Sequence, residues 1–141
     1  NYGGVSNLVN DEAVGDKVFF GTGQTVKGKL YYLDTNGAWV LADADAEVST
    51  ASLLAVACGG DGSGNANDAA SNGMLVRGFI DNASAIDGTF DQGDPVYVSL
   101  TAGNMTFTRP SASGDFVRCI GFACATASVI MFAPDNTWLE L

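Results

Sequence analysis

Short runs of apolar and aromatic residues alternate with clusters of Gly, Asn, Asp, Ser and Thr along this chain. The runs are too short for amphipathic helices and have the length of strands bounded by turns. The clearest pair, residues 96–98 and 105–107, flanks residues 101–104, where Gly and Asn can take a positive φ. This pattern predicts a β-hairpin within residues 93–110.

A second segment upstream has the same pattern. Residues 30–33 and 39–41 flank a turn that contains Asn36 and Gly37, and this dipeptide is the strongest short-range signal for a hairpin. We therefore predict another hairpin within residues 28–44.

The two hairpins belong to a longer similarity between the halves of the chain. LLAVAC at 53–58 aligns without gaps on CIGFAC at 119–124, and in each half this apolar run follows the hairpin. The similarity predicts an internal repeat of residues 25–81 and 90–135, with 59–73 inserted into the first copy. A duplicated β unit would bury its two apolar faces against each other. Chance similarity of two hairpins is the alternative.

The other apolar runs predict short strands at residues 17–20, 52–58, 74–80, 116–123, 129–132 and 138–141. We therefore predict an all-β fold, a compact β-barrel or sandwich built from two similar hairpin-plus-strand units. Residues 1–14 are predicted to form an N-terminal arm, in which Tyr2, Val5 and Leu8 follow a spacing of three, and residues 15–141 a single β domain. The arm either reaches a neighbouring subunit or frays.

Composition and charge narrow the choice of partners. A chain of 141 residues with 47% hydrophobic content is long enough for one domain with a core. Its net charge of −10 would repel a phosphate backbone, so we expect no nucleic-acid partner. We expect no membrane partner either, because no apolar run approaches the roughly 20 residues that cross a bilayer, and we predict a soluble protein. The scattered cations are expected at solvated positions or in local ion pairs: Lys27, Lys29, Arg77, Arg109 and Arg118.

The three cysteines, Cys58, Cys119 and Cys124, all lie within apolar runs and have no C-x-x-C spacing. Their odd number and their neighbours favour buried thiols over a disulfide framework or a zinc site. This usage is typical of a protein made in a reducing cytoplasm, and one disulfide with one free thiol is the alternative.

Asp43, Asp45 and Glu47 alternate with alanines. In an extended chain the three carboxylates would lie on one face. They could then form a calcium ligand set or the acid and base of a sugar hydrolase. We favour a solvated connector, in which repulsion between like charges prevents pairing with another strand.

Residues 59–73 contain no large apolar side chain, which predicts an exposed loop. Asp61, Ser63, Asn65 and either Asn67 or Asp68 follow the alternating spacing of the first calcium ligands of an EF-hand loop. The sixth position, however, holds Ala66 where the motif needs Gly, and the twelfth holds Asn72 where it needs Glu. We therefore predict no metal site here.

Four segments of the chain resemble, in this order, β-rich modules in virion structural proteins of tailed bacteriophages. They are GKLYYLDTNGAWVLADADA, LVRGFI, GDPVYVSLTAGNMTFTRPSASGDFVRCIGFA and MFAPDNTWLEL. In those modules a Gly-Asp/Thr-Pro-hydrophobic-Tyr strand precedes a Pro-Ser-x-Ser-Gly-Asp segment, a Val-Arg-x-x-Gly strand and a Pro-Asp-Asn-Thr-Trp ending. The resemblance covers residues 28–141, and its most specific parts are residues 110–121 and 134–138.

The resemblance implies a part of a virion, assembled in the cytoplasm of the host bacterium. Such modules occur in tail-fibre-like proteins and are similar to small β-barrel capsid decoration (cement) proteins, which are usually oligomeric and often trimeric. The expected partners are therefore further copies of the chain, in a homo-oligomer, and other virion proteins. The resemblance leaves the choice between capsid and tail open.

No catalytic, cofactor-binding or metal-binding residue is predicted. The chain has no His, no Ser or Cys nucleophile motif and no phosphate-binding glycine loop, so we expect a non-enzymatic structural protein. The alternative is a carbohydrate- or receptor-binding module of a tail fibre, whose partner is a cell-surface glycan. Its candidate stacking residues lie in strand patterns that favour burial: Tyr31, Tyr32, Trp39, Tyr97 and Trp138.

Overall fold

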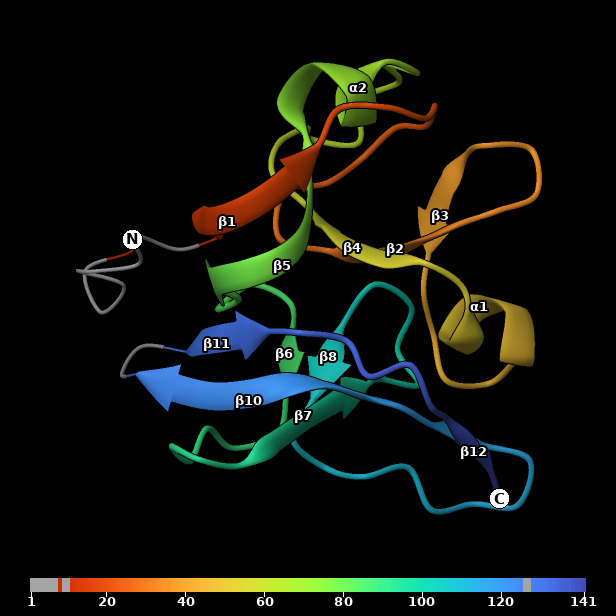
Figure 1. Cartoon of the computed structure of the whole chain (residues 1–141), viewed down its shortest axis with the longest axis vertical. Helices are drawn as coiled ribbons and strands as arrows, with labels where there is room; N and C mark the ends of the chain where they lie inside the picture. The colour runs from red at the N-terminus through yellow and green to blue at the C-terminus, as the bar shows by residue number, and fades with distance from the viewer. Residues whose placement is uncertain (1–7, 9–10, 126–127) are drawn as a thin grey trace.

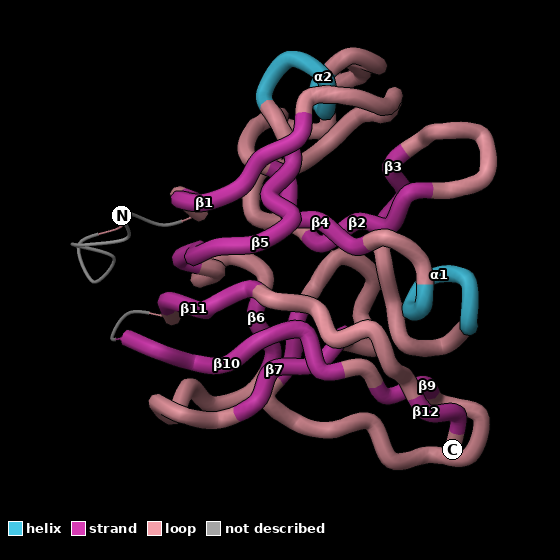
Figure 2. The backbone as a smooth tube through the Cα atoms, in the orientation of Figure 1, coloured by secondary structure: helices cyan, strands magenta, loops and turns pink. Residues whose placement is uncertain are grey.

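The computed structural model describes residues 8, 11–125 and 128–141, and most regular structure within them is β (Figure 1). The main sheet curls into a half-barrel. The tube in Figure 2 shows this sheet together with two short helices. The prediction of a mostly β, barrel-like chain is thereby confirmed.

The strands of the main sheet follow one path, and a single strand lies beside it. The order is β3 (Trp39–Leu41), β2 (Leu30–Leu33), β4 (Leu54–Ala57), β5 (Met74–Asp81), β11 (Val129–Phe132), β10 (Cys119–Ala125), β7 (Pro95–Val98), β8 (Met105–Thr106) and β6 (Ile86–Asp87). Outside this path, β1 (Ala13–Val18) pairs with β5. The remaining elements are the ribbon of β9 (Phe116–Val117) and β12 (Leu139–Glu140) and the helices α1 (Glu47–Ala51) and α2 (Asp68–Asn72).

Both predicted hairpins are confirmed, as β2–β3 and β7–β8. In the first turn, Asp34 Oδ1 accepts hydrogen bonds from the backbone N–H groups of Asn36 and Ala38, at 2.8 and 2.9 Å. Gly37 completes this turn with a φ of 78°, which costs a residue without Cβ little. The Asn-Gly signal thus identified the turn, and Asp34 holds its shape.

The turn of the second hairpin closes the half-barrel against the first hairpin. The backbone N–H of Gly103 donates to the carbonyl oxygen of Ala42 at 2.7 Å, and the N–H of Leu30 donates to the carbonyl oxygen of Gly103 at 2.8 Å. Gly103 has a φ of 83°, which favours glycine, and a Cβ there would displace the Leu41 side chain, whose methyl group would lie 2.6 Å away.

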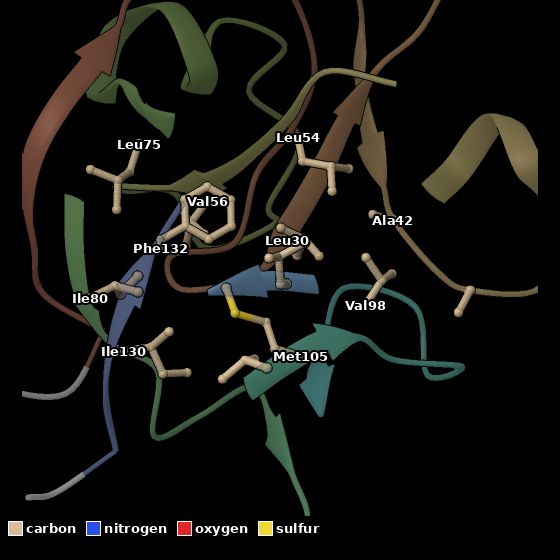
Figure 3. Close-up of a cluster of buried hydrophobic side chains, with 13 residues drawn as sticks. Leu30, Ala42, Leu54, Val56, Leu75, Ile80, Val98, Met105, Ile130 and Phe132 are labelled. Carbon is tan, nitrogen blue, oxygen red and sulfur yellow. The ribbon is translucent and has the colours of Figure 1, made fainter. Parts of the chain in front are cut away.

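The concave face of the sheet holds the main core (Figure 3). Its members come from both halves of the chain, and the largest, Phe132, is fully buried. Burying an aliphatic or aromatic side chain contributes about 1.5–3 kcal/mol, so this shared core joins the halves. The buried members are Leu30, Ala42, Ala44, Leu54, Val56, Leu75, Ile80, Val96, Val98, Met105, Ile120, Ile130 and Phe132.

A second, smaller core covers the outer side of β2 and β4. Tyr31 and Trp39 are buried there together with Ala69 of α2. The indole N–H of Trp39 donates to the carbonyl oxygen of Phe20 at 2.9 Å, and the rings of these two residues lie 5.8 Å apart. Residues 59–73 therefore include buried positions, so the prediction of an exposed loop is correct for residues 61–67 but wrong for α2.

Several predicted boundaries were wrong. The predicted strand was 17–20, but the first strand is β1, so Phe19 and Phe20 lie beyond it, while Gly15 and Asp16 belong to it. The run 116–123 is divided into β9 and β10 at Arg118. The predicted arm lies mostly outside the described residues, but its last two residues, Ala13 and Val14, pair with β5.

Two glycines let β1 lie against β5. Gly15 is directly opposite Gly78, with φ values of 150° and 148°. A Cβ on Gly78 would lie 2.7 Å from the Cα of Gly15 and would also collide with the carbonyl oxygen of Val14. Since neither obstacle is a flexible side chain, a larger residue at either position would push the strands apart.

We expect Gly78→Ala to lower the free energy of unfolding by at least about 2 kcal/mol, because overpacking and an unfavourable φ each cost on the order of 1–3 kcal/mol. Urea unfolding followed by fluorescence measures this change. Gly114→Ala is the matched control, since Gly114 has a φ of 92° and no atom within 4 Å of the added Cβ. Equal losses in the two variants would contradict the close approach of the strands.

Candidate functional site

The three alternating carboxylates do not form one group: Asp43 and Asp45 interact through a hydrogen bond, whereas Glu47 lies in a helix. The chain turns after Asp43, and Glu47 begins α1 behind its N-cap, Ala46. The hydroxyl of Ser49 donates to Asp43 Oδ1 at 2.8 Å, and a hydrogen bond with Asp43 raises the pKa of Asp45. The prediction of an extended segment was therefore wrong, because hydroxyls of α1 cap the turn. No carboxylate of this set lines the larger hollow described below, or a smaller one of about 190 Å³ beside β5 and β11.

The calcium-like spacing in residues 61–68 forms local turns. Asp61 Oδ1 accepts the backbone N–H of Ser63 at 2.9 Å, and Asn65 Oδ1 accepts that of Asn67 at 3.0 Å. Asp68 is buried, and its Oδ2 accepts the backbone N–H of Thr25 at 3.2 Å. Within residues 8, 11–125 and 128–141, no three Asp, Glu, Cys or His side chains are grouped to hold a metal ion.

The larger of the two hollows has a volume of about 390 Å³ and lies beside β8, and no sequence motif predicted it. Its charged lining residues are Asp87, Arg109 and Asp115. Asp87 accepts hydrogen bonds from the hydroxyl of Ser99 and, at 3.0 Å, from the amide of Asn104. Asp115 Oδ2 accepts the N–H of Ala112 at 3.0 Å. Both carboxylates thus hold loops in place.

Arg118 was expected at a solvated position or in a local ion pair, and it is instead buried, with 6% of its surface exposed. Its Nε donates to the carbonyl oxygen of Asp135 at 2.7 Å, and its Nη1 donates to those of Thr50 and Ser52 at 2.8 and 2.7 Å. Burial lowers the pKa of Arg118, and the nearby Asp135 carboxylate partly offsets this. An arginine inside an apolar strand run was the signal that could have predicted a buried clamp.

Four exposed apolar residues flank the acceptors of Arg118. Val48 and Leu53 lie on either side of Thr50 and Ser52, and Trp138 and Leu139 follow Asp135. Their exposed fractions are 55%, 47%, 43% and 52%, respectively. Helix α1 contacts β9, which pairs with β12, and all three elements lie on one side of the molecule in Figure 2. The four exposed residues lie in or next to α1 and β12, and we call them the end surface.

The candidate stacking aromatics are mostly covered. Tyr31 and Trp39 are buried, as the core interpretation predicts, and Tyr32 and Tyr97 are half-buried. Burial raises the pKa of Tyr31, whose hydroxyl accepts the backbone N–H of Val26 at 2.8 Å. Trp138 is exposed.

The thiols are free, but none of them is fully buried. Cys58 and Cys119 are half-buried and Cys124 is exposed, so the prediction of three buried thiols was wrong, most clearly for Cys124. Its strand, β10, alternates buried and exposed positions, and Cys124 lies on the exposed side with Phe122.

Asp81 is the last residue of β5 and Asn82 follows it, and each has a buried side-chain oxygen. Asp81 is 1% exposed and Asn82 is fully buried, and the Oδ1 atom of each lacks a hydrogen-bond partner among the described residues. Burial raises the pKa of Asp81, the backbone N–H of Ala83 lowers it, and the negative charge of Asp11 raises it again.

No family model matches the chain, and no curated protein and no solved structure matches it either. Within the described residues, no helix is long and apolar enough to cross a membrane.

We expect Cys124 to react with a thiol reagent at least several times faster than Cys58 and Cys119. Burial raises the pKa of both Cys58 and Cys124, which keeps both thiols protonated near neutral pH, so exposure decides the order. Mass spectrometry of the native protein after brief alkylation identifies the first labelled site. Cys124→Ser serves as the control and should remove the fast phase; equal labelling of all three thiols would contradict this order.

We expect Asp81→Asn to weaken the pH dependence of stability. The folded-state pKa of Asp81 lies above its unfolded value of about 3.9, so folding binds a proton, and the free energy of unfolding falls as pH rises through the folded-state pKa. Urea unfolding at several pH values from 4 to 7 measures the slope.

Asp61→Asn is the control for this measurement. Hydrogen bonds from Ser63 lower the pKa of Asp61, so its contribution has the opposite sign and its loss cannot flatten the decline. Identical pH profiles for wild type and Asp81→Asn would contradict the inference.

Proposed function

We propose that this chain is a non-enzymatic structural protein of a bacteriophage virion, a capsid decoration protein or a tail or fibre component. It assembles through contacts with copies of itself and with other virion proteins. The observation that carries the proposal is that the two segments with the most specific resemblance, residues 110–121 and 134–138, form one unit. Arg118 donates to the carbonyl oxygen of Asp135, and the N–H of Asp135 donates to that of Cys119 at 2.9 Å.

The end surface that this unit supports suits protein–protein contact. Interfaces combine apolar anchors with a fixed backbone, and Trp is among the residues that contribute most to binding. The backbone here is fixed twice more, since Leu141 and Asp115 pair at 2.9 Å and Phe116 donates to Ala44 at 2.8 Å. The backbone that carries the apolar anchors is therefore already ordered, so association loses little conformational entropy there.

Other functions have less support. The carboxylates of the larger hollow each accept hydrogen bonds that hold loops, which leaves them poorly suited to acid–base chemistry. A sugar-binding site would need an aromatic platform, and no aromatic residue lines this hollow. The only exposed member of the proposed stacking set is Trp138.

The strand connectivity supports an origin of the fold by duplication. In the first half β2 pairs with β3 and β4, and β4 pairs with β5. In the second half β7 pairs with β8 and β10, and β10 pairs with β11. We propose that residues 25–81 and 90–135 are two copies of this unit, which meet where β5 pairs with β11.

We expect the protein to form a homo-oligomer that the double substitution Trp138→Ser and Leu139→Ser weakens at least 30-fold. Loss of a central Trp anchor costs on the order of 2 kcal/mol, which corresponds to this change in Kd. Multi-angle light scattering over a range of concentrations gives the stoichiometry and the Kd.

Val40→Ser is the control, because Val40 is exposed to a similar extent, 39%, on β3. It should leave the oligomer unchanged. A protein that stays monomeric at every concentration, or an oligomer that the double substitution does not weaken, would contradict the proposal.

A further inference from the structure

Three polar side chains meet where the two hairpins touch. Lys29 precedes β2, Asn104 lies in the turn of the second hairpin, and Asp87 ends β6. Lys29 Nζ donates a hydrogen bond to Asn104 Oδ1 at 2.8 Å, and Asn104 Nδ2 donates one to Asp87 Oδ1 at 3.0 Å. All three residues are half-buried. An amine, a carboxamide and a carboxylate are thus in direct contact, in that order.

The backbone beside this contact is fixed. The N–H of Leu30 donates to the carbonyl oxygen of Gly103 at 2.8 Å, and these two residues directly adjoin Lys29 and Asn104. The stem of Lys29 runs along Gly103, since a Cβ on Gly103 would lie 3.1 Å from Lys29 Cδ. Because a carbonyl bond is about 1.2 Å long, Asn104 Cγ lies within about 4 Å of Lys29 Nζ. A small rotation at the end of the lysine side chain therefore brings these two atoms to the roughly 3–3.5 Å of an attack geometry.

Asp87 is held in place on the other side of the amide. Its Oδ2 accepts the hydroxyl of Ser99, which is 3% exposed, and its backbone carbonyl oxygen accepts the N–H of Phe107 at 3.2 Å. These bonds leave Asp87 poorly suited to act on a ligand in the larger hollow. Its Oδ1, however, faces Asn104 Nδ2, so it is placed to accept a proton and return it at that nitrogen.

We propose that Lys29 and Asn104 form an intramolecular isopeptide bond, with Asp87 as the catalytic residue that transfers the proton. The ammonium of Lys29 first releases a proton to water, and the neutral amine attacks Asn104 Cγ. The Nζ–Cγ bond forms, the Cγ–Nδ2 bond breaks, and Nδ2 leaves as ammonia. One hydrogen of the amine stays on the new amide, and Asp87 passes the other to Nδ2. The step needs no oxidant, reductant or activated co-substrate.

Two properties of the site allow this reaction without a separate enzyme. Well-oriented groups within one molecule react with effective molarities of about 10⁵–10⁸ M, and a positioned acid–base group contributes a further factor of about 10²–10⁴. The released ammonia is diluted into solvent, so the reverse reaction requires its return. The bond forms within one chain and is independent of the proposed virion role.

The bond would tie the two halves of the chain together covalently. It joins positions 75 residues apart, at the place where Gly103 already connects the hairpins by hydrogen bonds. A cross-link over a long loop stabilises a fold mainly by restricting the unfolded chain. The half-barrel would then be closed by a covalent bond that a reducing environment leaves intact.

Intact-mass spectrometry of the denatured protein tests the proposal. In wild-type protein kept folded for several days, most molecules should be lighter than the sequence by one ammonia. Tryptic digestion should then give a branched peptide that joins the segments containing Lys29 and Asn104. Lys29→Arg keeps the positive charge but supplies no nucleophilic amine, so it should have the full sequence mass. Lys27→Arg is the matched control, because Lys27 is exposed two residues away, and it should keep the bond.

Asp87→Asn tests the carboxylate separately. Asparagine has the same size and retains an oxygen acceptor for Ser99, but it cannot carry the proton. The bonded fraction should grow at least tenfold more slowly than in wild type, because a positioned acid–base group contributes a factor of about 10²–10⁴. An unchanged rate in a folded variant would overturn the assignment of Asp87.

The full sequence mass in wild-type protein would overturn the proposal, because the three side chains would then form hydrogen bonds only. A loss of ammonia that persists in Lys29→Arg would overturn it as well, since the ammonia would come from another asparagine, such as Asn36 through a succinimide with Gly37. The branched peptide is sought in wild-type protein, so the decision does not require that every variant folds.

Discussion

The close contact between Gly15 and Gly78 is the constraint on which the sheet depends most. Strand β5 pairs with β4 near its start, with β11 near its end, and with β1 over most of its length. Strand β1 can lie along β5 only because the two backbones approach closely at these glycines, and a Cβ at either position would collide with the other strand. Because β5 also pairs with β4 and β11, it joins the two halves of the sheet.

Arg118 has a comparable role at the opposite end. Three carbonyl oxygens, from two segments distant in sequence, accept hydrogen bonds from its guanidinium group. A buried cation is costly unless it is hydrogen-bonded, and here three of its five N–H groups donate to carbonyl oxygens. This clamp holds the backbone of the end surface and leaves apolar side chains exposed, an arrangement expected of a rigid assembly surface.

The convex face of the sheet is treated differently in the two halves. Over β2 and β4, α2 and the segment before β2 cover Tyr31 and Trp39 in a second core. Over β10 and β11, Phe122 and Met131 remain exposed. Residues 59–73 include α2 and thus account for part of the cover of the first half.

The sequence by itself determined the mostly β character, both hairpins and most strand centres, because these follow from local alternation of apolar runs with turn residues such as Asn36 and Gly37. Only the tertiary structure decided the burial of Arg118, the inclusion of Gly15 in β1, the exposure of Cys124 and the start of α1 at Glu47. The burial of Arg118 and the inclusion of Gly15 in β1 depend on partners more than 30 residues away. The exposure of Cys124 depends on which side of its strand is covered. The start of α1 depends on hydroxyl groups that hydrogen-bond to Asp43 and compete with an extended chain. Local pattern carries no information about such partners, so long-range packing decided them.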